Sequence, residues 1–255
     1  KASKAFEFYA NISENYRSVT FADISISNPA YSINPEISDE NGLTFDFGFR
    51  GNYKKKFSYD FGFFSLFYND RIGFIQKVFK DGSVKSEKGN VGNAVMYGIE
   101  SLIDFDLNNI FINNNNYSFN YFINSSIITS EYTNSDIPGV MGNKVEFVPN
   151  LNIKSGFKFG HKNLMLNLQY TYLSKQFTDA SNAKKSNLSG LIGEIPFYDI
   201  LDFSASYFFK TFKVETGMNN VLNKNYFTRR ATGYPGPGII PSEPRSIYLT
   251  IQFKI

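Results

Sequence analysis

Residues 247–255 read Ile247-Tyr248-Leu249-Thr250-Ile251-Gln252-Phe253-Lys254-Ile255, with an aliphatic or Phe side chain at every odd position. Successive side chains of a β-strand point to opposite faces, so this period of two predicts a strand with one apolar and one polar face. The alternation recurs in nine upstream segments, which are 212–219, 201–209, 164–172, 151–159, 117–127, 95–107, 57–67, 43–49 and 6–12. The sequence therefore predicts an all-β antiparallel fold of about ten strands.

The strand lengths favour a transmembrane barrel over a soluble sandwich. Alternation alone would also fit an immunoglobulin-like or lectin-like domain with an apolar inner face. Here, however, Phe, Tyr, Leu and Ile fill the apolar face from end to end. A strand that crosses a membrane in a barrel needs about 9–11 residues, and several segments reach that length.

The connections between the segments alternate between short and long. The short ones lie near 52–56, 108–116, 160–162 and 210–211, and the long ones near 15–42, 77–89, 132–144, 177–198 and 221–244. Outer-membrane barrels have this asymmetry, with tight periplasmic turns and long extracellular loops. An even number of strands would then leave both chain ends on the periplasmic side.

The composition excludes several other classes of protein. The 255 residues include 28 Phe and 17 Tyr but no Cys, which removes disulfide scaffolds, thiolate metal sites and Cys nucleophiles. The net charge of +3 is too small and scattered for a nucleic-acid partner. The longest uncharged run, Leu107 to Ser130, holds eight Asn and so predicts no transmembrane helix.

No enzyme, cofactor or metal site is expected. The single His, His161, lies in the tight turn Gly160–Asn163, at the end opposite the extracellular rim where a barrel protease would need it. Asp104 and Asp106 share a strand face, but alternation alone accounts for that spacing. We therefore expect no catalytic residue.

Several segments resemble characteristic passages of TonB-dependent outer-membrane receptors. Asn34-Pro-Glu-Ile, followed by Thr44-Phe-Asp-Phe-Gly-Phe-Arg50, resembles the NPxxxPE…ELGxR passage, with its second Pro-Glu reduced to Asp39-Glu40. Asn93-Ala-Val-Met-Tyr-Gly-Ile-Glu100 is similar to the family's N…A…GxE strand start, and Asn220-Val-Leu-Asn-Lys-Asn-Tyr-Phe227 to its NLFDKxYF stretch. The segment 226–238 resembles the ferric dicitrate transporter branch more specifically, especially its Bacteroidota-type members.

This resemblance covers essentially the whole chain and implies a 22-stranded barrel filled by an N-terminal plug with a TonB-box. Residues 1–255 would supply the C-terminal portion of the barrel, without the plug. An open half-barrel would leave two unpaired edges in lipid, so we expect a fragment, a partial structure or one piece of a split barrel. A sheet closed between the strands near Phe6 and Ile255 would contradict this expectation.

The resemblance also implies the location and the partners. The location is the outer membrane of a Gram-negative bacterium. The partners are outer-membrane lipid, the remaining N-terminal barrel half with its plug, a ferric chelate ligand and, through the plug, the TonB–ExbB–ExbD energy complex.

Ligand contacts are expected in the long loops. Arg229 and Arg230 stand in tandem, flanked by Tyr226 and Tyr234, and bidentate guanidinium donors among aromatic walls suit an anionic ferric chelate. The alternative for both arginines is solvation or contact with lipopolysaccharide phosphates.

Other charged residues are weaker candidates. Arg17 and Arg71 lie near predicted extracellular strand ends and are ligand candidates, with loop-stabilising ion pairs as the alternative. Five residues on the polar face are predicted to face the lumen, where hydrogen bonding to water or the plug is the default role; they are Arg50, Asp60, Glu100, Lys213 and Glu215.

Three functions remain open at this point. The leading hypothesis is TonB-coupled import of a ferric chelate, with ferric citrate as the first guess. The second is TonB-dependent import of an oligosaccharide or peptide, and the third is a structural or passive-pore barrel. A plug and TonB-box encoded upstream of Lys1 would eliminate the third.

Overall fold

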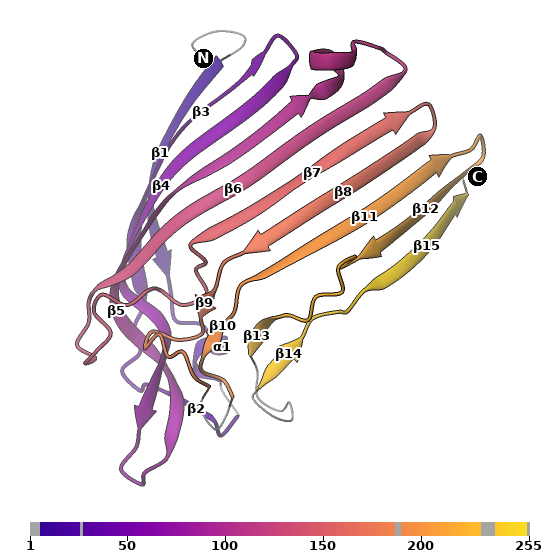
Figure 1. Cartoon of the computed structure of the whole chain (residues 1–255). Coiled ribbons are helices and arrows are strands. Elements are labelled where there is room, and N and C mark those ends of the chain that lie inside the picture. Colours follow the sequence, from indigo (N-terminus) through magenta and orange to yellow (C-terminus); the bar gives the residue numbers. More distant parts are fainter. Residues whose placement is uncertain (1–5, 26–27, 187–189, 231–237, 254–255) are drawn as a thin grey trace.

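The computed structural model describes residues 6–25, 28–186, 190–230 and 238–253. Ten strands follow one another as antiparallel neighbours in one curved sheet (Figure 1). In sheet order they are β1 (Phe6–Arg17), β3 (Glu40–Tyr53), β4 (Phe57–Val78), β5 (Val84–Asp106), β6 (Tyr117–Asn134), β7 (Leu151–His161), β8 (Leu164–Leu173), β11 (Tyr198–Phe208), β12 (Phe212–Asn219) and β15 (Ser246–Phe253).

The remaining elements are short and lie in the connections. They are α1 (Phe21–Ile24), β2 (Tyr31–Ile33), the π-helix η1 (Asn108–Ile112), β9 (Gln176–Phe177), β10 (Glu194–Ile195), β13 (Phe227–Arg230) and β14 (Ile239–Pro241). Of these, β2 joins the main sheet as a parallel neighbour of β5, whereas β9 pairs with β10 and β13 with β14. No helix in the described part of the chain is long and apolar enough to cross a membrane.

The two faces of the sheet follow the period-two pattern. Phe47 of β3 is paired with Phe63 of β4, and these side chains are 48% and 44% exposed. Moving one such ring from water into apolar surroundings is worth about 1.5–3 kcal/mol, so a whole face of them needs a lipid environment. The opposite face carries polar side chains, as in the pair Arg50 and Asp60. The predicted all-β antiparallel fold of about ten strands is confirmed.

The sheet is open. β1 pairs with β3 and β15 pairs with β12, and within the described residues these two outer strands do not pair with each other. The ten strands therefore form part of a barrel wall, and this part contains no plug, as the sequence predicts.

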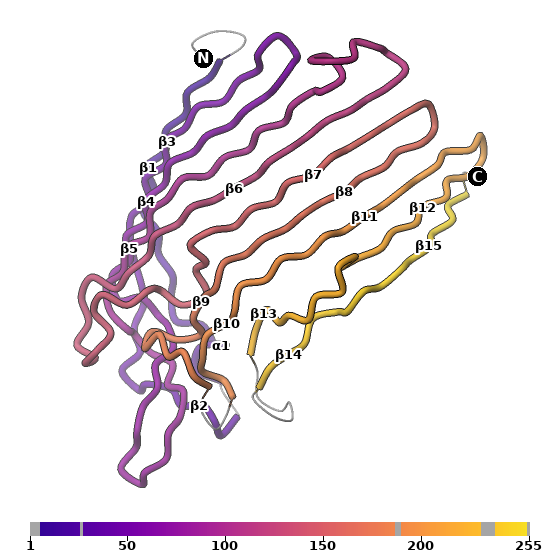
Figure 2. Tube along the Cα trace, in the orientation of Figure 1, coloured from indigo at the N-terminus to yellow at the C-terminus, as the bar shows by residue number. Residues whose placement is uncertain are grey.

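The connections lie on opposite edges of the sheet according to their length. The short turns between β3 and β4, β7 and β8, and β11 and β12 lie at the same edge as both chain ends (Figure 2). One expected long loop is different. β4 and β5 continue as a paired hairpin far beyond their neighbours, so residues 77–89 contain paired strand ends and a turn of residues 79–83. Register shifts between Tyr68 and Ile72 break the alternation of apolar and polar residues there, so the period of two did not predict that the two strands continue.

The buried core of the described chain lies among the long loops rather than within the sheet. It gathers Ile75, Val91, Ala94, Tyr132, Val140, Val145 and Ala180. Backbone contacts tie these loops together, since the Ala180 amide donates to the Phe74 carbonyl at 3.0 Å. The Asn143 side-chain amide also donates to the Ala180 carbonyl, at 2.9 Å. The connections thus form a packed platform at the long-loop end of the sheet.

Candidate ligand-binding sites at the long-loop end

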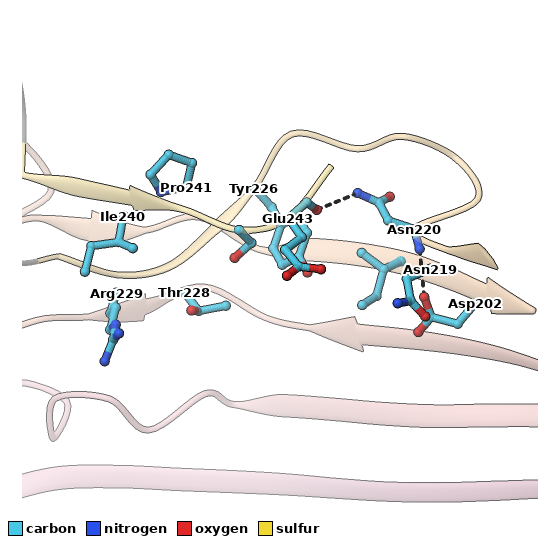
Figure 3. Close-up of a pocket in the computed structure, with 11 residues that line it drawn as sticks. Asp202, Asn219, Asn220, Tyr226, Thr228, Arg229, Ile240, Pro241 and Glu243 are labelled. Carbon is cyan, nitrogen blue, oxygen red and sulfur yellow. Dashed lines mark hydrogen bonds between the residues drawn. The ribbon is translucent and has the colours of Figure 1, made fainter. Parts of the chain in front are cut away.

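A pocket with a volume of about 620 Å3 lies where the chain leaves β12 and returns toward β15. Its lining includes Ile200, Asp202, Asn219, Asn220, Tyr226, Thr228, Arg229, Ile240, Pro241, Ser242 and Glu243. Arg229 and Asp202 lie toward opposite ends of it (Figure 3).

Asn220 shapes this pocket. Its backbone has φ +50°, a left-handed conformation that Asn tolerates better than most residues, and its side chain is buried. The Asn220 backbone amide donates to Asp202 Oδ1 at 2.8 Å, and its side-chain amide donates to the Lys224 carbonyl at 2.8 Å and the Glu243 carbonyl at 3.4 Å. The Lys224 amide donates back to Asn220 Oδ1. One side chain therefore fixes the sharp exit from β12 and the returning strand.

The two tandem arginines have different surroundings. Arg229 is exposed, lines the pocket, and makes no ion pair with any residue in the described ranges. Arg230 points into the neighbouring connection, where its guanidinium donates to the carbonyls of Gly190 and Glu194 at 3.4 and 3.2 Å. It also lies over the Phe227 ring, at 5.2 Å from the centroid. Burial lowers the pKa of Arg230. Of the pair, Arg229 is the one available to a ligand.

Of the two flanking aromatic candidates, only Tyr226 lies within the described residues. The ring of Tyr226 lines the pocket and packs against Tyr198, with centroids 4.7 Å apart. Tyr234 lies outside the described residues.

Arg17 and Arg71 line a second pocket, of about 330 Å3, although they are far apart in the sequence. Arg17 pairs with Asp23 at 2.7 Å, and Lys88 pairs with the same carboxylate at 2.5 Å. Glu40 lies 3.6 Å from Arg17 and accepts a hydrogen bond from the Ile72 amide at 2.6 Å. These cations already face carboxylates, so an anionic ligand would have to compete for them.

Asp23 and its partners fix the loop that follows β1. Asp23 is 1% exposed and accepts hydrogen bonds from the Thr20 amide and hydroxyl. Burial alone would raise the pKa of Asp23, but the hydrogen bonds from Lys88 and Thr20 lower it well below its usual value. The carboxylate is therefore charged at neutral pH.

Arg71 belongs to a buried cluster in the loop platform. Its guanidinium pairs with Glu146 at 2.5 Å and donates to the Tyr132 hydroxyl at 2.9 Å, and this hydroxyl donates to Glu146 at 2.7 Å. Burial and the adjacent Glu146 raise the pKa of Tyr132. Burial alone would lower the pKa of Arg71, but Glu146 and Tyr132 raise it. Arg71 is therefore a charged residue that ties the loop holding Glu146 to β4 and β6.

The residues predicted to face the lumen all fall on the polar face by register. In the strand register Arg50 lies opposite Asp60, and Glu100 lies opposite Gly62. The Arg50 guanidinium forms an ion pair with Glu7 at 3.3 Å. Lys213 contacts Glu215 at 2.6 Å. Asp60 and Glu100 also line a third pocket, of about 330 Å3, with Tyr9 among its walls.

Sequence reasoning missed several residues of these sites. Asn220 begins the segment 220–227 that resembles a family motif, and Asn220 and Asn223 are both of a residue type that favours turns. Asp202, Glu146 and Tyr132 carry no local signal, because their partners come from other strands and loops.

Comparisons with known proteins place these features in a wider context. Residues 1–221 match the family described as TonB dependent receptor-like, beta-barrel. No curated protein sequence matches the chain. The structure is similar to that of the ferric citrate transporter FecA in the unliganded form, with a TM-score of 0.75 and 20% identity over 98% of this chain and 36% of that one.

Two further solved structures are similar in the same way. The copper transporter OprC gives a TM-score of 0.74 at 14% identity, with 98% of this chain and 37% of that chain covered. The siderophore receptor PiuA from Acinetobacter baumannii gives 0.70 at 18% identity, with 99% and 34% covered. The chain thus spans little more than a third of these structures, and the likeness concerns the fold.

Proposed function

Because the chain belongs to the TonB-dependent receptor family of non-enzymatic, Gram-negative outer-membrane barrels, we propose that residues 1–255 supply the C-terminal barrel portion of an importer for a ferric chelate. Ferric citrate is the first candidate cargo. The plug and the remaining strands would come from the rest of the receptor, and the plug would couple it to the TonB–ExbB–ExbD complex. We also propose that the chain belongs to the ferric dicitrate transporter branch of the family, among its Bacteroidota-type members.

The observation that carries this proposal is the exposed guanidinium of Arg229 on the 620 Å3 pocket. A planar guanidinium binds carboxylates in a bidentate way and keeps its charge at any physiological pH. Thr228, Asn219 and Tyr226 add hydroxyl and amide groups along the same pocket. A ferric chelate that carries free carboxylates matches this set of donors.

Asp202 and Glu243 line the same pocket and set a limit on the charge of the ligand. Asp202 is engaged by the Asn220 amide at 2.8 Å and lies away from Arg229 (Figure 3). We therefore propose that an anionic chelate binds at the Arg229 end of the pocket. In this arrangement Arg17 and Arg71 stabilise loops, and the polar-face residues Arg50, Asp60, Glu100, Lys213 and Glu215 line the lumen.

A second candidate cargo is an oligosaccharide or peptide. Carboxylates, side-chain amides and a tyrosine hydroxyl beside one arginine would also hydrogen-bond neutral hydroxyl or peptide groups. The presence of Asp202 and Glu243 favours this alternative, because neither carboxylate assists a chelate anion.

Growth with ferric citrate as the sole iron source separates these candidates. We expect the full-length receptor to restore growth to a strain that lacks it, and we expect Arg229→Ala to reduce that growth strongly. Arg245→Ala is the matched control, because Arg245 lies in the same connection but does not line the pocket. The double variant Arg229→Ala/Arg230→Ala should be no better than Arg229→Ala.

Two results would contradict the proposal in different ways. Unchanged growth with Arg229→Ala and with Arg229→Ala/Arg230→Ala would remove Arg229 from the binding site. A wild-type receptor that gives no growth advantage on ferric citrate would remove ferric citrate as the cargo.

A further inference from the structure

Four glycines on the polar face of the sheet each lie beneath an aromatic ring of the directly paired residue on the next strand. The pairs are Tyr9 with Gly48, Phe64 with Gly98, Phe122 with Gly156, and Tyr248 with Gly217. A glycine weakens a strand interior, so four such pairs in register require a physical reason.

In each pair the ring occupies the space of the missing side chain. A Cβ added at Gly48 would lie 2.2 Å from the Tyr9 ring, and one at Gly217 would lie 2.5 Å from three atoms of Tyr248. At Gly98 and Gly156 the corresponding distances to the ring are 3.0 and 2.9 Å. At Gly98 and Gly156 a backbone carbonyl oxygen, of Ile127 and Leu168 respectively, lies closer still to the added Cβ, at 2.4 Å. A side chain at any of the four glycines would therefore crowd the ring that lies over it.

Two of the rings also carry a cation nearby. The Arg50 guanidinium lies 5.7 Å from the centroid of Tyr9, and the Lys158 ammonium lies 4.8 Å from that of Phe122. Cation–aromatic contacts of this length are attractive. They add to the glycine contact in holding these rings against the wall.

The residues two positions before and two positions after each glycine disfavour other registers of the two strands. A strand that slips by two residues keeps its apolar and polar faces, so alternation alone does not prevent such a slip. After it, Phe122 would meet Lys154 or Lys158 in place of Gly156, and Tyr248 would meet Glu215 or Asn219. Tyr9 would meet Asp46 or Arg50, and Phe64 would meet Met96 or Glu100.

The position of the pairs in the topology also indicates a role in fixing the strand register. Five pairs of neighbouring strands are joined at the long-loop end of the sheet, namely β1–β3, β4–β5, β6–β7, β8–β11 and β12–β15. The four glycine–ring pairs fall in four of these five. A tight turn fixes the register of the strands that it joins, whereas a long connection leaves it open.

We propose that these four glycine–ring pairs are register locks, which select one alignment of the strands. Three of them act between strands that no tight turn joins, and the fourth, Phe64 with Gly98, acts in the β4–β5 hairpin, where the register shifts between Tyr68 and Ile72 separate it from the turn. Each lock acts because the ring fits over a glycine and over neither of the residues two positions away. This role is independent of the cargo.

The lock between β12 and β15 gives the sharpest test, because the three nearest atoms to an added Gly217 Cβ all belong to Tyr248. Residues 1–255 contain no Cys, so an introduced pair meets no competing thiol within this part of the receptor and can report the strand register in the outer membrane. Thr216→Cys/Leu249→Cys joins native partners, and Val214→Cys/Leu249→Cys joins positions that face each other only after a two-residue slip.

We expect the native pair to cross-link, and the slipped pair to give more cross-linked product with Tyr248→Thr than without it. A cross-strand pair worth 0.2–1 kcal/mol implies a rise of up to about fivefold in the slipped product. Gln252→Thr is the matched control, since Gln252 occupies the same face of β15 opposite Lys213. No slipped product with Tyr248→Thr, or as much with Gln252→Thr, would overturn the proposal.

A double-mutant cycle gives a second, independent measurement. Gly217→Ala should lower the temperature at which the folded barrel loses its fast gel mobility, and the loss should be much smaller when Tyr248→Thr is present. If Gly217→Ala prevents assembly, rescue by Tyr248→Thr supports the lock. An equal effect of Gly217→Ala in both backgrounds, or an assembly defect that Tyr248→Thr does not rescue, would overturn it.

Discussion

Replacing Glu146 with alanine should open the loop platform without unfolding the sheet. Glu146 is 3% exposed and faces the Arg71 guanidinium at 2.5 Å and the Tyr132 hydroxyl at 2.7 Å. The substitution leaves a cation and a hydroxyl in the platform without their acceptor. Removing one partner of a buried ion pair costs about 3–5 kcal/mol.

The expected cost is somewhat smaller than that range. The Arg71 side chain is 18% exposed, so water partly replaces the lost carboxylate. We therefore expect local opening to become easier by about 2–4 kcal/mol, or roughly 30- to 900-fold. Tyr132→Phe removes hydrogen bonds to charged groups but leaves the ion pair, and should cost about 1.5–3 kcal/mol.

Hydrogen exchange of the full-length receptor measures this directly. In Glu146→Ala, protection of the backbone amides from exchange should fall in residues 135–150 and 174–186 and stay unchanged in β7 and β8. Lys175→Met is the control, because Lys175 forms an ion pair with Glu194 while 52% exposed and should change protection by at most about 1 kcal/mol. Equal protection in Glu146→Ala and Lys175→Met would refute the view that this cluster holds the platform together.

Three further predictions concern single side chains at the loop end. The pKa of Asp23 is lowered in the folded chain, so the stability that its carboxylate contributes is complete above the usual carboxyl pKa of about 3.9 and is lost as the pH falls below that value. Protection of the backbone amides of residues 18–25 from hydrogen exchange should fall over the same acidic range. A loss of protection centred near neutral pH would contradict this assignment. Burial raises the pKa of Asp179, which is 1% exposed, so the charged form is disfavoured and stability is lost as the pH rises through the raised value; Asp179→Asn should therefore increase thermal stability more at pH 8 than at pH 4, and a gain confined to low pH would exclude this reasoning. Asn220→Ala loses three side-chain hydrogen bonds and keeps an unfavourable positive φ, for an expected cost of about 2–4 kcal/mol, whereas Asn220→Gly keeps the backbone freedom and should cost less; equal thermal shifts in the two variants would show that φ contributes nothing.

The strands and their faces could be predicted from the sequence because the period of two is a local property. In 247–253 the type of each residue indicates the face of the sheet on which it lies. The structure pairs these residues with β12 so that apolar residues lie opposite apolar residues at Ile251 and Val214 and at Ile247 and Met218. The extension of β4 and β5 was missed because Asn69 and Asp70 lie between the shifts in register, where the period changes phase. The pattern therefore predicted the wall and failed where the wall continues beyond the other strands.

The site could be predicted only in part, because its contacts are not local. Arg71 and Glu146 are 75 positions apart, and nothing near either residue predicts their ion pair. Arg229 and Arg230 are adjacent and identical in type, yet one lines a pocket and the other binds carbonyls of a different connection. The neighbouring loop, rather than the residue type, decides which arginine is available to a ligand.

The most direct test of the proposed function is energised uptake of iron-55 citrate. Cells that lack the receptor and carry the full-length gene should take up the label in a saturable way, and an uncoupler of the proton gradient should abolish this uptake. Arg229→Ala should lower the initial rate, and Arg245→Ala should leave it unchanged. Equal uptake with and without the receptor gene would contradict the proposal that this chain belongs to a ferric citrate importer.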